Sequence, residues 1–183
     1  MKTEYERKQA NKSGRTAREC ALLAVFVALV IAAQAVLSSV PGVEVVTVLF
    51  VAYSFTMGWK KGMAAATAFS LLRQMIFGVF PTVLVLYLIY YNLLAFGFGL
   101  LGKKTQNPRK WLWLIVLLAC LGTVLFTMID NILTPLWYGY SAKATRLYFF
   151  ASLPFMFPQV ICTAVSVTVL FIPLWRVFKL SIR

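Results

Sequence analysis

The residue types that carry out most acid, base and nucleophilic chemistry are scarce in this sequence. It contains no histidine and only five acidic residues, and Glu4, Glu6 and Glu19 lie in or beside a basic N-terminal segment. Without histidine, Ser–His and Cys–His nucleophile pairs and the commonest metal ligand are missing. Too few carboxylates remain for paired acid–base catalysis. The sequence therefore predicts a protein that is not an enzyme and that needs no metal or cofactor.

One glycine-rich stretch has the spacing of a phosphate-binding loop. It runs from Gly97 to Lys103, but Lys104 stands where that motif requires serine or threonine. The motif also needs a preceding strand, whereas this stretch ends an apolar segment. Glycines there favour close helix packing, and the lysines favour an interfacial anchor. We therefore expect no nucleotide site in this chain.

Polar residues inside apolar segments are more informative, because ionisable groups at membrane depth are costly and normally mark a site. Arg73 and Asp130 allow two interpretations, either an ion pair that fixes the bundle or two walls of an outward-facing ligand pocket. The segment 136–148 is rich in aromatic and basic residues, which suits either an aromatic belt at the headgroups or a lid over a ligand. The candidate ligand-binding residues are Glu44, Arg73, Gln74, Tyr91, Asn92, Asp130, Asn131, Trp137, Tyr140 and Arg146.

The composition indicates which elements must position these residues. Of the 183 residues, 61% are hydrophobic and 13% are charged, and the mean hydropathy is +0.83. Soluble domains carry about 25% charged residues, so lipid is the expected solvent. Glycine, proline and lysine breakers divide the chain into six apolar segments, at about 16–39, 45–57, 63–80, 82–101, 111–135 and 149–177. The prediction is an all-α, polytopic bundle of six transmembrane helices, with the second segment short for a crossing.

The basic residues predict the orientation of this bundle. Fifteen of the 18 lysines and arginines fall on one side of the six-segment scheme, and only Lys143 and Arg146 lie in a loop on the other side. The positive-inside rule then places both termini in the cytoplasm. We expect a basic cytoplasmic tail at 1–15, a membrane domain at 16–178 and a second tail at 179–183. We therefore expect the basic residues behind the net charge of +13 to set the orientation in the membrane and to contact lipid, and we do not expect nucleic-acid binding.

Small residues recur along the first apolar segment at three- and four-residue steps, which places them on one helical face. Such a face lets another helix approach closely. The sequence leaves two alternatives open, packing inside the bundle or docking on a partner membrane protein. The docking alternative involves Ala17, Ala21, Ala24, Ala28, Ala32 and Ala35.

Taken together, these features resemble the S component, the substrate-binding subunit, of energy-coupling factor (ECF) vitamin transporters. The likeness covers about residues 16–177 and rests on size, six segments, the alanine-stepped first segment and the turn Val40-Pro41-Gly42-Val43-Glu44-Val45-Val46-Thr47. It implies a multi-pass protein of a prokaryotic cell membrane with a vitamin pocket near the outer surface. It also implies partners, namely a transmembrane coupling subunit on the alanine face and two cytoplasmic ATPases. Motifs associated with thiamine, biotin or riboflavin are not evident, and cobalamin is our first expectation for the ligand.

Two other classes of function fit the sequence less well. A self-contained transporter or channel for small solutes would need no ATPase partners. An intramembrane enzyme or an assembly factor is the third class, and the missing histidine and scarce acids count against the enzyme.

Overall fold

The computed structural model describes residues 4–37, 45–105 and 107–182, and it is all-helical within these ranges. The first and last helices are longer than the apolar segments predicted for them. The first helix begins at Glu4, so it includes the polar stretch that precedes the first apolar segment. The helices are α1 (Glu4–Leu37), α2 (Val46–Met57), α3 (Trp59–Phe77), α4 (Pro81–Lys104), α5 (Leu112–Tyr138) and α6 (Ala142–Ile182).

Four helices are long and apolar enough to cross a membrane: α1 over Thr16–Leu37, α4, α5 and α6. The 19-residue α3 is less apolar because it carries Lys60, Lys61 and Arg73. The 12-residue α2 would be about 18 Å long, well short of a hydrocarbon core of about 30 Å. The architecture is that of a helical membrane protein with four apolar candidate spans.

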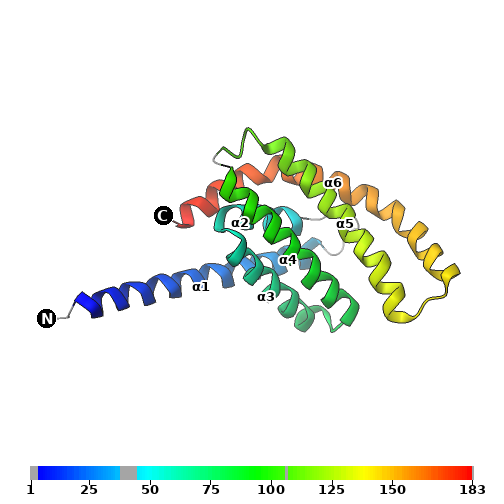
Figure 1. Cartoon of the computed structure of the whole chain (residues 1–183), viewed down its shortest axis with the longest axis horizontal. Helices are drawn as coiled ribbons and strands as arrows, with labels where there is room; N and C mark the ends of the chain where they lie inside the picture. Colours follow the sequence, from blue (N-terminus) through cyan, green and yellow to red (C-terminus); the bar gives the residue numbers. More distant parts are fainter. Residues whose placement is uncertain (1–3, 38–44, 106, 183) are drawn as a thin grey trace.

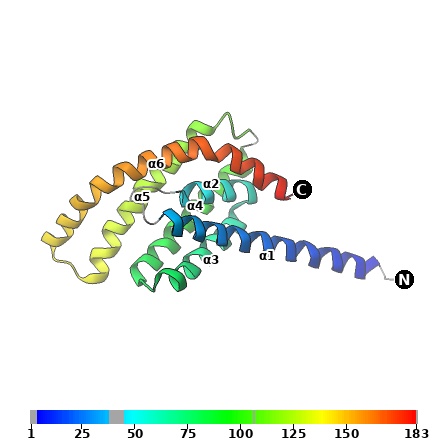
Figure 2. The ribbon, with the colours of Figure 1, turned by 180° about the vertical axis from the view of Figure 1, so that it is seen from behind.

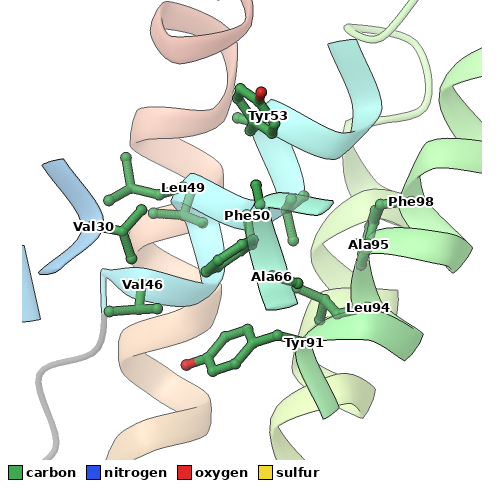
Figure 3. Packing of buried hydrophobic residues seen from close by; sticks show 14 of the residues in the cluster. Val30, Val46, Leu49, Phe50, Tyr53, Ala66, Tyr91, Leu94, Ala95 and Phe98 are labelled. Carbon is green, nitrogen blue, oxygen red and sulfur yellow. The ribbon is translucent and has the colours of Figure 1, made fainter. Parts of the chain in front are cut away.

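The short α2 lies at the centre of the bundle. Every residue from Val46 to Phe55 is buried, and α2 packs against α1, α3, α4 and α6. The Phe50 ring lies 4.8 Å from that of Tyr91 on α4 (Figure 3). The Tyr53 ring stacks at 3.9 Å on that of Phe26 of α1. A helix that is apolar all round is stable only when it is covered on all sides.

A tight turn joins α3 and α4 into a hairpin. Gly78 ends α3 with a φ of 96°, and Pro81 begins α4 at a position where its missing N–H costs nothing. The side chain of Gln74 closes the turn, since its Oε1 accepts a 3.0 Å hydrogen bond from the backbone N–H of Phe80.

Gly99 and Gly102 of α4 confirm the packing role predicted for the glycines of this stretch, whereas Gly97 has no neighbouring atom within 4 Å of a built Cβ. A Cβ on Gly102 would collide with the carbonyl of Phe55, and one on Gly99 would collide with the backbone of Trp59. The end of α4 therefore lies directly against the α2–α3 turn, which passes through Gly58 at a φ of 86°.

The α5–α6 connection differs from the prediction of a loop over 136–148. Helix α5 runs through Pro135 and ends at Gly139, which adopts the left-handed conformation with a φ of 63°. Helix α6 begins at Ala142, where the Ser141 Oγ accepts a 3.3 Å hydrogen bond from the N–H of Ala144. The predicted loop is therefore wrong, and the connection is limited to residues 139–141. Residues 142–148 contain neither glycine nor proline, so nothing in them breaks a helix.

Basic side chains meet at one end of the bundle. The Arg18 Nη2 donates to the Ser181 carbonyl at 3.1 Å, and Lys61 forms a 3.0 Å ion pair with Glu19. Lys60 and Lys103 both contact the Trp59 ring. The start of α1 and the end of α6 lie on one side, and the α5–α6 turn lies on the other (Figures 1 and 2).

Candidate functional site

A cavity of about 330 Å³ opens between α5 and α6, towards the end of the bundle that carries the α5–α6 turn. Aromatic side chains and a few polar groups line it, which is the usual character of a small-molecule site. Its lining residues are Phe126, Thr127, Asp130, Tyr148, Ala151, Ser152, Phe155 and Gln159.

The carboxylate of Asp130 is the only acidic group in this lining. Its Oδ1 accepts a 2.8 Å hydrogen bond from Thr134 Oγ1 on the same helix. Its Oδ2 accepts a bond of equal length from the hydroxyl of Tyr148 on α6. Two hydroxyl donors therefore compensate part of the cost of holding this charge away from water.

The neighbouring Asn131 points between the two helices. Its Nδ2 donates to the Ser152 Oγ at 2.8 Å, while its buried Oδ1 has no hydrogen-bond partner. Asn131 also lines a shallow groove on the other side of the hairpin, which it shares with Arg146 and Phe150. An unsatisfied buried carbonyl is costly, and Asn131 lines the groove with Arg146 but not the cavity itself.

Arg73 on α3 forms a second polar centre. Its Nε donates to Gln34 Oε1 on α1 at 3.2 Å, and Gln34 Nε2 donates to the hydroxyl of Tyr87 at 3.1 Å. The guanidinium carbon lies 4.7 Å from the centre of the Tyr87 ring and 5.2 Å from that of Phe77. Its Nη1 is buried without a hydrogen-bond partner. Three helices thus hold this cation by stacking and one amide, and no carboxylate among the described residues pairs with it.

Aromatic rings connect the two centres. The Tyr87 ring, which lies beside Arg73, is 6.0 Å from the ring of Phe126. Phe126 in turn lines the cavity and precedes Asp130 by one helical turn. The predicted alternative of an Arg73–Asp130 ion pair does not form among the described residues, since each group has other partners.

The remaining candidates lie elsewhere. Tyr91 is 1% exposed and belongs to the core. Asn92 is fully engaged on the α3–α4 surface, donating to the Leu88 carbonyl and accepting from Thr67. Trp137 and Tyr140 are exposed at the α5–α6 turn. Glu44 lies outside the described residues.

Sequence analysis missed several residues of the two centres. Gln34 was detectable, because it is the one amide in an otherwise apolar stretch of the first segment. Gln159 carried the same signal, as an amide within an apolar stretch. The hydroxyl and aromatic residues gave none, because such side chains are common throughout apolar helices. The missed residues are Gln34, Tyr87, Thr134, Ser152 and Gln159.

The two faces of α1 differ sharply. Phe26, Val27 and Val30 are at most 3% exposed and belong to the core. The face that carries the alanines is open over the length of the apolar segment. Its exposed members are Ala17, Ala21, Ala24, Ala28, Ala32 and Ala35. Packing inside the chain therefore does not account for this face.

Comparisons of the chain with protein-family models, curated proteins and solved structures give no match.

Proposed function

We propose that this protein is the membrane-embedded substrate-binding subunit of an ECF-type importer. The observation that carries the proposal is the exposed alanine face of α1, which lies opposite the buried face formed by Phe26, Val27 and Val30. In a membrane, helix association depends on close backbone approach. A smooth face along a whole apolar helix therefore suits a partner helix of a transmembrane coupling subunit. Two cytoplasmic ATPases would then supply the energy that this chain has no means to supply.

The cavity between α5 and α6 supports a role in ligand binding. We place its opening on the outer side of a prokaryotic cell membrane and both termini in the cytoplasm. This orientation follows the gathering of basic side chains at the opposite end, around Trp59 and Lys61. Asp130, Tyr148 and Gln159 offer polar contacts, and Phe126 and Phe155 offer ring contacts.

The sizes of the hollows on this hairpin bear on the ligand. The cavity has about 330 Å³, near the lower end of the usual range for small-molecule sites. The groove lined by Asn131 and Arg146 has about 810 Å³. Both open to the surface, so their volumes set no upper limit on the size of the vitamin.

The test replaces Ala24 and Ala28 together by tryptophan, so that bulk holds a partner helix away. We expect the variant to retain small molecules that co-purify with the wild type, as identified by mass spectrometry. It should lose co-purification with the transmembrane subunit and ATP-dependent uptake. The matched control is the Val25→Trp, Leu29→Trp variant, whose sites on α1 are 67% and 48% exposed but lie off the alanine face.

Normal assembly of the Ala24, Ala28 variant would refute the docking face. Uptake by the wild type in cells without ATPase partners would instead support a self-contained transporter.

A further inference from the structure

A second hollow lies between α4 and α5, at the end of the bundle opposite the α5–α6 turn. It is an open groove of about 430 Å³. Its lining is apolar apart from Lys104 at one end, and Tyr90, whose hydroxyl is buried, lies at the other. The lining residues are Tyr90, Leu93, Leu94, Gly97, Phe98, Leu100, Leu101, Lys104, Leu118, Leu121, Gly122 and Leu125.

One glycine leaves this groove open on the α4 side. A Cβ built on Gly97 would meet no atom within 4 Å, so the space beside it is empty. Gly122 of α5 instead allows the two helices to pack closely, because a Cβ there would lie 3.2 Å from Leu94 Cδ1. A larger residue at Gly97 would therefore occupy the groove.

The length of the groove matches one leaflet. Tyr90 and Lys104 are fourteen residues apart on one helix, a rise of about 21 Å. One leaflet, with its headgroup region, is about 20–22 Å thick. An extended acyl chain can therefore lie along the groove with its headgroup at the level of Lys104.

The charge at the end of the groove selects the headgroup. Lys104 is exposed and follows Lys103, and the exposed Arg109 and Lys110 precede α5 on the same side. Among the side chains that the structure describes, the one carboxylate at this end is that of Glu19, which is paired with Lys61. Among these described side chains, none supplies a counter-charge to the cations at the groove. Basic pockets between transmembrane helices are known to bind anionic lipid headgroups.

We propose that the α4–α5 groove binds one anionic phospholipid, with an acyl chain in the open space beside Gly97 and the phosphate at Lys104. The site is separate from the α5–α6 cavity. It requires only that the protein be embedded in a membrane, so it does not depend on the proposed transport function.

The test uses native mass spectrometry of the delipidated full chain in detergent, titrated with dioleoyl phosphatidylglycerol or dioleoyl phosphatidylcholine. The two lipids share acyl chains, so their difference reports the headgroup. We expect the wild type to retain phosphatidylglycerol about fivefold more tightly per cation engaged. Lys104→Gln should lower that preference about fivefold, whereas Lys143→Gln, at the opposite end, should not.

Gly97→Leu fills the groove and should reduce retention of both lipids, whereas Ala64→Leu on the exposed face of α3 should not. Thermal unfolding in lipid-free detergent checks that Gly97→Leu is folded. Equal retention of the two lipids by the wild type would overturn the proposal, as would wild-type retention by a folded Gly97→Leu variant. A Gly97→Leu variant that loses a protein partner while its lipid binding is unchanged would assign the groove to that partner instead.

Discussion

The hydroxyl of Tyr148 donates a 2.8 Å hydrogen bond to Oδ2 of Asp130, and so ties the first turns of α6 to α5 beside the cavity. Both residues line the cavity, so the same hydrogen bond holds the two helices together and helps to stabilise the Asp130 carboxylate.

Tyr148→Phe should therefore destabilise the protein. The substitution keeps the ring but leaves one carboxylate oxygen of Asp130 without its donor, at a cost of about 1–3 kcal/mol. The measurement is the midpoint of thermal unfolding in detergent. Tyr138→Phe is the control, because the exposed Tyr138 ring stacks on Tyr140 and no hydrogen bond of its hydroxyl is found. Equal midpoints for the two variants would mean that the Asp130 contact contributes nothing.

Arg73 and Gln34 should respond unequally to the same replacement. Arg73→Met removes a cation whose Nη1 is buried without a hydrogen-bond partner, but it also removes the donor to Gln34 Oε1, so the two effects should largely offset in the free energy of unfolding. Gln34→Met removes the acceptor of Arg73 Nε and a donor to the Tyr87 hydroxyl with no compensating gain, and should cost about 1–3 kcal/mol. Chemical denaturation of the two variants compares them directly. An Arg73→Met variant that is less stable than Gln34→Met would contradict this prediction, because it would show that the surrounding groups stabilise the Arg73 charge.

The glycines of α4 provide an internally controlled pair. Gly102→Ala places a methyl group against the Phe55 carbonyl and should be strongly destabilising, because backbone cannot move aside cheaply. Gly97→Ala meets no neighbouring atom and should be neutral or stabilising by up to about 1 kcal/mol, since alanine favours helix. Thermal unfolding separates the two. Similar losses in both variants would contradict the close approach of α4 to the α2–α3 turn.

Topology can be tested with single cysteines. In a background with Cys20, Cys120 and Cys162 replaced by alanine, cysteine at Lys104 should resist a membrane-impermeant reagent applied to intact cells. Cysteine at Lys143 should react with it. Both positions are exposed in the structure, so burial does not protect either of them. Labelling of both positions from outside would exclude the six-span arrangement.

Much of the helical order follows from breakers in the sequence. Pro81 and the glycines at 58 and 78 mark real helix ends, because each suits a backbone geometry that few other residues tolerate. Pro135 did not end α5, since a proline near a helix end removes one hydrogen bond that nearby groups can replace. Local sequence therefore predicted the number and order of the helices better than their lengths.

The site residues were harder to predict, because polarity alone does not reveal direction. Asn92 and Asp130 are both polar residues in apolar helices, yet Asn92 bonds to Thr67 and its own helix while Asp130 lines the cavity. That difference depends on the rotation of α4 and α5 about their axes. Rotation is set by tertiary packing, such as the contact between Tyr87 and Phe126, which one sequence does not encode locally.

The complete enclosure of α2 has a consequence for biogenesis. Its partners include α6, which the ribosome makes after three further helices. Until α6 arrives, part of an apolar helix too short to cross the bilayer has no protein neighbour. Insertion of the nascent chain must therefore end with a late closure step, in which α6 covers α2. A chain interrupted before α6 would present that uncovered surface to the quality-control proteases of the membrane.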